Sequence, residues 1–240
     1  MKKLQVHEKF AIIKKKEHLM KKGFTLSELL MALTIVGVIA TLTVPVLMNN
    51  VHNKTFANQV KNMSATIEQL AQDQLITHRT RDLNDTDFGD PEKLLSDDHF
   101  SIAKKCTSDE SLTKCWKTTA TGKDKVTYKM LNRAVYTGFP QSQVTIILKN
   151  GVIISYGISS SPNALGAFIM DINGNDKPNI AGRDLFVFHV NNKGHVVGYN
   201  VVDAMNKNLE QLNQCCKNST DIAARCCYDA LADNGWKMDY

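Results

Sequence analysis

The sequence lacks the short motifs that identify the common enzyme classes. It contains no Gly-x-Ser-x-Gly nucleophile elbow, no His-Glu-x-x-His zinc motif and no P-loop. No Ala-x-Ala-like cleavage site follows its apolar N-terminal run, and no cysteine precedes residue 106. We therefore expect neither an enzyme nor a protein exported with an ordinary cleaved secretory signal peptide.

The feature that replaces these motifs is a long apolar run, Phe24 to Val44. It holds 21 residues, 14 of which are Ala, Val, Ile, Leu, Met or Phe. At about 1.5 Å per residue a helix of this length reaches roughly 31 Å, which spans a bilayer. Residues 1–23 carry eight lysines and two glutamates, a net charge of +6. A basic flank stays in the cytoplasm, so the chain after Val44 is expected outside.

The positive charge of the chain is concentrated in this leader. The full chain carries +5, so the remainder carries 5 − 6 = −1. The leader lysines suit the anionic inner leaflet of a membrane. The basic pI therefore does not indicate binding to nucleic acid, and no such partner is expected.

An acidic residue, Glu28, lies inside the apolar run. A charged side chain at mid-bilayer costs about 2.5 to 3.5 kcal/mol on insertion scales, so it usually has a partner or a function. An ordinary signal anchor fits the length and orientation of the run. It does not explain Glu28, or why Gly23-Phe24 marks the boundary between the basic and apolar segments.

Ten residues at this boundary resemble the processing motif of type IV pilins and of the pseudopilins of type II secretion: Lys21-Lys22-Gly23-Phe24-Thr25-Leu26-Ser27-Glu28-Leu29-Leu30. The resemblance implies that a prepilin peptidase in the bacterial inner membrane cuts between Gly23 and Phe24 and methylates the new amine of Phe24. It further implies assembly with identical or related subunits, by dedicated machinery, into a periplasmic or extracellular filament. Pro45 falls where many relatives carry a helix-bending proline.

The physical chemistry of Glu28 agrees with this resemblance. After cleavage, the ammonium group of Phe24 lies about one helical turn from Glu28. Pairing Glu28 with the amine of an adjacent subunit would offset the cost of both charges in lipid and set the axial register between subunits. Gly23 suits the cleavage site because a residue without Cβ lets a protease approach the backbone closely.

The helix is expected to continue to about Thr77. Apolar residues spaced by three and four define one stripe of an amphipathic helix: Phe56, Val60, Met63, Ile67 and Leu70. Pro45 removes one backbone donor and is expected to bend the helix without ending it. The predicted organisation is a leader (1–23), a transmembrane helix (24–44), an extracytoplasmic helical half (45–77) and a globular head with a Cys-rich C-terminal segment (78–240).

The head is predicted to hold an antiparallel sheet packed on the helix, an α+β fold of the kind that pilins have. Arg79 to Lys125 is expected to be a surface connection with a short helix near Pro91 to Leu95, and Val126 to Asn200 to be strand-rich. Asn150-Gly151 predicts a hairpin with a type I′ turn. A second turn, Asn191 to Gly194, is expected before a strand over His195 to Asn200.

The C-terminal segment is expected to form a helix from Asp221 to Asp233. Ser219 or Thr220 would cap it and Gly235 would end it. Trp236 would then pack as a hydrophobic lid over the core. His189 and His195 flank the second turn and are expected to be ordinary strand residues.

The segment from Asp171 to Asp184 has two interpretations. Oxygen-bearing side chains at alternating positions, represented by Asp171, Asn173, Asp176 and Asp184, could bind calcium. It is not an EF-hand loop, because Gly174 and Gly182 stand at the wrong positions. The segment resembles a loop of pseudopilin-like proteins, some of which bind calcium. Alternatively, these residue types only build a turn between strands.

Six cysteines follow the membrane segment, at positions 106, 115, 215, 216, 226 and 227. An even count outside the cytoplasm indicates disulfides, with fifteen formal pairings. We favour Cys106 with Cys115 and cross-links between the two vicinal pairs. A zinc site is disfavoured because adjacent cysteines do not match common zinc spacing.

The predicted function is that of a structural filament subunit serving adhesion, motility, DNA uptake or secretion. The sequence does not separate pilus from secretion pseudopilus, or a major from a minor subunit. The alternative is a membrane-anchored extracytoplasmic module that binds a ligand or cation through the Asp171 to Asp184 loop.

Overall fold

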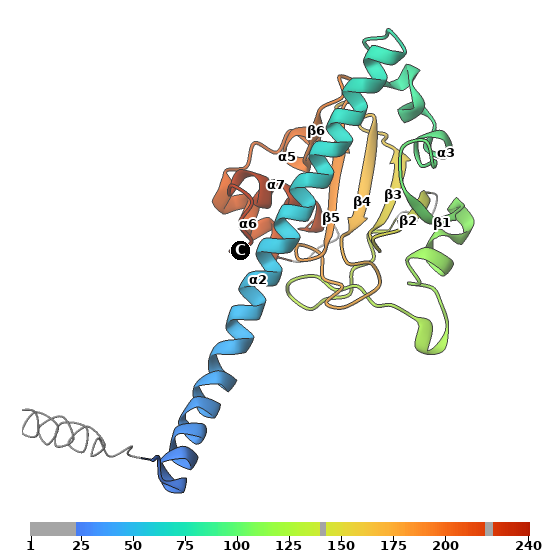
Figure 1. Ribbon diagram of the computed structural model, residues 1–240. Helices are drawn as coiled ribbons and strands as arrows, with labels where there is room; N and C mark the ends of the chain where they lie inside the picture. The colour runs from blue at the N-terminus through green and yellow to red at the C-terminus, as the bar shows by residue number, and fades with distance from the viewer. Residues whose placement is uncertain (1–22, 140–142, 219–222) are drawn as a thin grey trace, which may run out of the picture. The chain divides into compact units, whose positions relative to one another are not determined.

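The protein combines one long helix, a six-stranded sheet and a group of short C-terminal helices (Figure 1). The computed structural model describes residues 23–139, 143–218 and 223–240. All neighbouring strands of the sheet pair antiparallel. The predicted α+β layout is therefore confirmed. Residues 1–22 of the predicted leader (1–23) lie outside the described residues.

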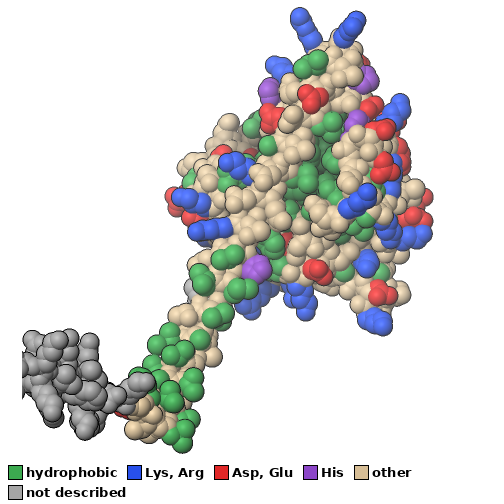
Figure 2. Space-filling view, in the orientation of Figure 1, with side chains coloured by type: hydrophobic (Ala, Val, Ile, Leu, Met, Phe, Trp, Pro, Cys, Tyr) green, Lys and Arg blue, Asp and Glu red, His purple; other side chains and the backbone are tan. Residues whose placement is uncertain are grey.

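Helix α2, Leu26–Thr77, has 52 residues and continues across Pro45. Figure 2 shows hydrophobic side chains along its first half, where Phe24, Leu33 and Leu42 are each at least two-thirds exposed. The predicted continuity of the helix is confirmed. A bend at Pro45 remains a prediction.

The second half of α2 buries a stripe against the sheet. Its fully buried residues are Ala57, Val60, Ile67 and Ala71, whereas the predicted stripe members Phe56, Met63 and Leu70 are half-buried at its margin. The most buried positions of the helix therefore include two small residues, Ala57 and Ala71, that were not in the predicted stripe. Small side chains let the backbone of α2 approach the sheet closely, and the larger neighbours close the sides of the contact.

The sheet order is β1-β2-β3-β4-β5-β6. The strands are β1 Ile102–Cys106, β2 Val144–Leu148, β3 Ile153–Ile158, β4 Gly166–Asp171, β5 Leu185–Val190 and β6 Val196–Val197. Ile154, Phe168 and Phe188 face α2, and alternate residues such as Ile169 and Val187 face a second cluster around Trp116. Both faces of the central strands are therefore buried.

The expectation of an unstructured connection from Arg79 to Lys125 was wrong in part. The expected short helix is present as α3, Pro91–Leu94, with Pro91 in its first turn and the Asp90 side chain accepting from the Glu92 N–H. The segment also contains the edge strand β1, whose Lys104 and Lys105 are exposed. Lysines on an edge strand oppose pairing with other chains. They also break the apolar pattern by which a strand is predicted from sequence.

The segment's other short helices are η1 Leu83–Asp85, η2 Asp87–Gly89, α4 Ser108–Glu110, η3 Ser111–Cys115 and η4 Gly122–Asp124.

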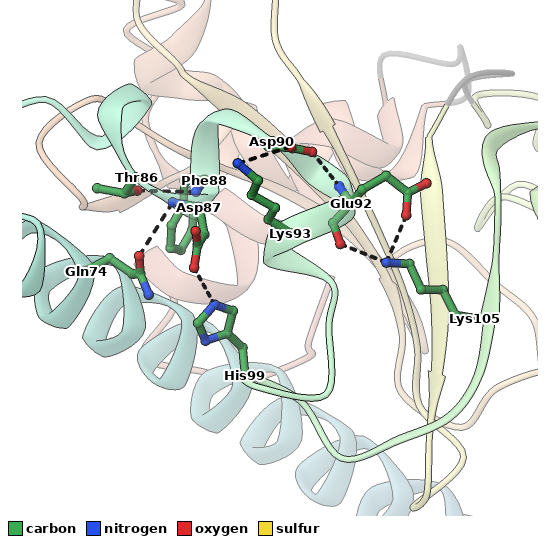
Figure 3. Close-up of polar contacts among 9 residues, drawn as sticks. All are labelled: Gln74, Thr86, Asp87, Phe88, Asp90, Glu92, Lys93, His99 and Lys105. Atoms are coloured by element: carbon green, nitrogen blue, oxygen red, sulfur yellow. Dashed lines mark hydrogen bonds and ion pairs between the residues drawn. The ribbon is translucent and has the colours of Figure 1, made fainter.

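Polar contacts fasten this connection to α2 and to β1 (Figure 3). The Asp87 N–H donates to Oε1 of Gln74 on α2 at 3.5 Å, and the Asp87 carboxylate lies 2.8 Å from Nε2 of His99. Lys105 on β1 contacts the carboxylate and the backbone carbonyl of Glu92 at 2.8 and 2.7 Å. The start of the connection is thereby held at the end of the helix.

Two further expectations about the strands need correction. Described residues from 126 to 143 form no strand. They are irregular chain whose side chains, Tyr128 among them, pack in one cluster with Trp116. The turn between β2 and β3 is not type I′, because Gly151 has a φ of 91° while Asn150 has no positive φ. The Gly151 N–H donates to the Leu148 carbonyl at 2.9 Å, as in hairpin loops that place one glycine after a type I turn.

The chain after β6 is helical. Helix α5, Tyr199–Val202, occupies part of the predicted strand His195 to Asn200, so that strand is limited to Val196–Val197. Helix α6, Leu209–Lys217, was not predicted, although Asn208 and Gln211 form a capping box at its start. Helix α7, Ala223–Asp233, matches the predicted C-terminal helix, and its expected caps lie outside the described residues. After α7, Gly235 has a φ of 62°, and half-buried Trp236 packs beside Tyr228.

Candidate functional site

The predicted cleavage site lies at an exposed start of α2. Phe24 is 79 % exposed, and no atom lies within 4 Å of the position that a Cβ on Gly23 would occupy. A peptide bond that is cut by a protease must enter the cleft of that protease as extended chain. Gly23 and Phe24 precede the first helical residue, Leu26, so their backbone is free of the helix.

Glu28 has a local partner that the sequence analysis missed. The N–H and the hydroxyl of Thr25 both donate to Oε2 of Glu28 at 2.8 Å, and the Glu28 N–H donates to Oγ1 of Thr25 at 3.2 Å. This reciprocal arrangement is a capping box, for which Thr25-x-x-Glu28 is the sequence signature. Glu28 thus satisfies donors at the N-terminus of α2 within one chain.

Helix α2 also meets the requirements for a membrane span. Among the described residues it is the one helix long and apolar enough to cross a membrane by length and composition, and its most apolar window is entirely unburied. Its start carries the Gly23-Phe24 bond and Glu28. The three predicted processing and assembly residues therefore lie within one helical turn of the beginning of a candidate span.

The Asp171 to Asp184 loop joins β4 to β5 and buries two carboxylates. Tyr128 donates to Oδ2 of Asp171 at 2.7 Å, and the Asn173 N–H donates to Oδ1 at 3.1 Å. The two oxygens of Asp184 accept from the N–H groups of Asn179 and Ile180, both at 2.6 Å. Burial raises the pKa of both carboxyl groups, and the neighbouring Asp184 adds to the rise at Asp171.

The predicted calcium ligands are brought together only in part. Asp171 and Asp184 are fully buried, but Asp176 is exposed. No group of three or more His, Cys, Asp or Glu side chains within the described ranges could hold a metal. The loop instead presents buried amide oxygens without hydrogen-bond partners on Asn173, Asn175 and Asn179.

These orphaned oxygens are what a hard cation would require. Buried polar atoms are nearly always paired, so three unpaired acceptors in one short loop need an explanation. The amide nitrogens of all three side chains donate to backbone carbonyls, which turns their oxygens away from those bonds. Calcium takes six to eight oxygen ligands, including Asn carbonyls. Asn173, Asn175 and Asn179 thus offer acceptors of the type that calcium takes, and the exposed Asp176 is not among them.

The Asp171 to Asp184 loop packs against a disulfide of the C-terminal helices. The structure contains Cys106–Cys115, Cys215–Cys226 and Cys216–Cys227, the pairing that the sequence favoured. Gly182 has a φ of 87°, and a Cβ there would lie 2.8 Å from Sγ of Cys227 and 3.0 Å from Sγ of Cys216. The Tyr240 hydroxyl donates to the Gly182 carbonyl at 2.7 Å. The close packing on the disulfide explains why a glycine stands at this position.

The two histidines have different environments. His195 is exposed and its Nδ1 lies 3.1 Å from the carboxylate of Glu68 on α2. His189 on β5 is 2 % exposed, and its Nδ1 is buried without a partner. Burial lowers the pKa of His189 to about 4, with the neighbouring Arg225 as a second cause. His189 is thus a strand residue, as the sequence predicted, but one with a buried Nδ1 that has no hydrogen-bond partner among the described residues.

Comparison with known proteins gives one result, at the N-terminus. No curated protein and no solved structure matches the chain. Residues 19–44 match the family model described as the prokaryotic N-terminal methylation motif. This match covers the Gly23-Phe24 bond, Glu28 and the first part of α2. The chain therefore carries the N-terminal methylation motif that is the signature of type IV pilins and pseudopilins.

Proposed function

We propose that this chain is a structural subunit of a type IV pilus or of a type II secretion pseudopilus. A prepilin peptidase cleaves it after Gly23 and methylates Phe24, and the subunits assemble through α2. Before assembly the protein is anchored in the bacterial inner membrane with its N-terminus in the cytoplasm. The leader (1–23), membrane span (24–44), outer helical half (45–77) and head (78–240) keep these roles in the proposal.

The observation that carries the proposal is the methylation motif at the start of an exposed apolar helix. Cleavage would create an ammonium group on Phe24, about one helical turn from Glu28. The Glu28 side chain is fully exposed on the isolated chain apart from its contact with Thr25, so it is accessible to the amine of a second subunit. An ion pair between subunits would offset the cost of both charges in lipid and fix the axial register. Pro45 would bend α2 between the membrane and the head.

The substitution Glu28→Ala tests this assignment. Membrane insertion should persist, because an alanine is cheaper in lipid than a glutamate, while incorporation into filaments should fall at least tenfold. Incorporation is measured by immunoblotting the material sheared from cells. Asp73→Ala, which removes an exposed acid from the second half of the same helix, is the matched control and should assemble normally. Normal incorporation of Glu28→Ala would remove the pairing from the proposal.

A second function, cation binding, is favoured by the orphaned oxygens of the β4–β5 loop. Asn173, Asn175 and Asn179 would supply amide oxygens, and Asp171 and Asp184 would supply carboxylates. A bound calcium would neutralise the two buried acids and fasten β4 to β5. This proposal assigns a binding role to the head and is compatible with filament assembly.

Calcium binding is measured as a rise in melting temperature when calcium is added to the chelator-treated full-length chain in detergent. We expect a rise of several degrees, because a ligand present at 100 times its Kd adds about 2.7 kcal/mol to stability. Asn179→Leu should abolish the rise, and the exposed neighbour Asp176→Asn should retain it. An equal melting temperature with and without millimolar calcium would contradict the site.

A further inference from the structure

The sheet face turned away from α2 has a hollow between two polar side chains. Gly157 on β3 pairs with Ala167 on β4, and Ala167 pairs with His189 on β5, so the three lie in one row across the sheet. The Gln143 side chain covers Gly157, because a Cβ on Gly157 would lie 2.6 Å from Cγ of Gln143. Ala167, whose side chain is a single methyl group, leaves open space between Gln143 and His189.

The hollow is part of a pocket of about 460 Å³. Its walls include the aromatic rings of Tyr136, Phe139 and Tyr199 and the guanidinium of Arg225, and its floor includes Ala167. Small-molecule sites have volumes of roughly 300 to 1,000 Å³, with mainly apolar walls and a few placed polar groups.

Two buried side-chain atoms on residues that line this pocket have no hydrogen-bond partner among the described residues. They are Oε1 of Gln143 and Nδ1 of His189, on residues that are 8 % and 2 % exposed. Oε1 of an amide only accepts hydrogen bonds, so it requires a donor. Because nearly all buried polar groups in native proteins are paired, the unpaired Oε1 of Gln143 points to a ligand that donates a hydrogen bond to it.

Arg225 on α7 supplies a positive charge at the same pocket. Its Cζ lies 4.5 Å from the centroid of the Tyr199 ring, and the Tyr199 ring lies edge-on to His189 at 4.2 Å. Arg225 makes no ion pair with any residue that the structure describes. A guanidinium over an aromatic ring keeps its N–H donors, which match the two oxygens of a carboxylate.

We propose that this pocket binds a small organic carboxylate with an adjacent N–H donor and an apolar body. This chemistry is shared by an N-acylated amino acid and by the C-terminal end of a peptide. Arg225 pairs with the carboxylate, Oε1 of Gln143 accepts the N–H, and the apolar side chain of the ligand enters the hollow above Ala167. The site lies on the far side of the sheet from α2 and does not depend on N-terminal processing.

The test uses calorimetric titration of the full-length, disulfide-bonded chain in detergent. The probes are N-acetylphenylalanine and its neutral amide, which has the same ring and N–H donor but no charge. We expect saturable binding of the acid and at least tenfold weaker binding of the amide, since a charge-assisted bidentate pair is lost. Arg225→Gln should weaken binding of the acid by a similar factor. Lys149→Gln, which removes an exposed charge near the β2–β3 turn, should leave it unchanged.

Ala167→Leu should abolish binding because its side chain fills the hollow. If this variant does not fold, as judged by its melting curve, Gln143→Met removes the acceptor at equal length and should weaken binding of the acid without changing its charge preference. An acetylated tripeptide ending in phenylalanine separates the two sources: tighter binding of the tripeptide identifies a peptide end, and weaker binding identifies a free acylated amino acid. No saturable binding at millimolar probe, or equal binding of the acid and the amide, would overturn the proposal.

Discussion

Glu28 has one partner in the isolated chain and is proposed to gain another in a filament. In the isolated chain it accepts two hydrogen bonds from Thr25, which caps the N-terminus of α2. Cleavage after Gly23 would add an amine at Phe24, one residue before that cap. The Glu28 carboxylate therefore has two candidate roles, as a cap of its own helix and as a contact between subunits, and an experiment has to separate them.

Thr25→Ala separates the two roles. The substitution removes the hydroxyl from the capping box and should cost the start of the helix about 1 kcal/mol, while leaving the Glu28 carboxylate in place. We expect filament incorporation to stay within about twofold of the wild type in the shear fraction. If Thr25→Ala loses assembly as completely as Glu28→Ala does, the local cap accounts for the effect and pairing between subunits is not needed.

Asp171 makes the stability of the head depend on pH. Burial raises its pKa to about 8, whereas a carboxyl group in the unfolded chain titrates near 4. The folded protein therefore binds a proton between these values that the unfolded chain has released, so the free energy of unfolding falls as the pH rises through this window. His189 acts in the opposite direction, but only below about pH 6.5, because its pKa is lowered to about 4.

We expect the melting temperature of the chelator-treated chain to fall between pH 6.5 and 8.5. Asp171→Asn should remove most of this fall because the amide does not titrate, and the exposed control Asp176→Asn should keep it. The melting curves are recorded by circular dichroism at several pH values. A melting temperature that rises over this range in the wild type would show that Asp171 is not buried as an acid.

The predictability of these residues differs for a physical reason. Glu28 was predicted to have a function because a charged residue within an apolar run is visible in the sequence alone, and Gly23 and Phe24 were assigned from the resemblance to the pilin processing motif. Thr25 was missed although Thr-x-x-Glu is itself a local pattern. The orphaned oxygens of Asn175 and Asn179 and the pairing row of His189 arise from contacts between distant segments, and no spacing in the sequence encodes them.

Among the elements, α2 is one whose extent could be predicted from apolar periodicity but whose buried face could be predicted only in part. Its extent was predictable because three- and four-residue spacing continues past Pro45. Its contact surface is centred on Ala57 and Ala71, which carry too little apolar area to dominate a pattern. Close approach to the sheet selects small residues at the centre, so the larger side chains at the margin gave the more visible stripe.

The strands were predictable where both of their faces are buried. Strands β3, β4 and β5 are continuous apolar runs, and they lie where the sequence indicated. Edge strand β1 is largely exposed and carries two lysines, so its composition resembles a loop. The type I′ turn was a wrong inference from Asn150-Gly151, because a single glycine after a type I turn satisfies the same residues.

The two disulfides between α6 and α7 are predicted to be partly redundant. Cys215–Cys226 and Cys216–Cys227 each span 11 residues, so they close almost the same loop. A disulfide stabilises mainly by restricting the unfolded chain, typically by about 2 to 4 kcal/mol, and a second bridge across the same loop adds little restriction.

Replacing Cys215 and Cys226 by alanine should therefore lower the free energy of unfolding by less than half of the loss caused by replacing all four cysteines. Urea unfolding followed by circular dichroism measures both losses. Cys106→Ala with Cys115→Ala serves as the comparison, because that bridge has no parallel partner and its removal should cost about 2 to 4 kcal/mol. A loss for the single bridge removal that reaches half of the loss for the double removal would show that each bridge acts independently.

For the whole molecule, we propose that removal of the leader changes the net charge of the chain and the way in which it is held in the membrane. The net charge falls from +5 to −1, and the basic anchor at the cytoplasmic surface is lost. What remains is an apolar helix with an ammonium group at its start and Glu28 one turn away. Such a helix is poorly suited to an isolated membrane anchor, because each charge needs a partner. The proposed filament supplies that partner from a neighbouring copy.

The mass of the N-terminal peptide, taken from the chain in its native membrane or sheared from cells, tests this account most directly. The account predicts a chain that begins at Phe24 with one methyl group on its amine, and an uncleaved chain when the prepilin peptidase is absent. An intact leader of 23 residues on the cell-surface material would contradict it and leave a membrane anchor as the function of α2.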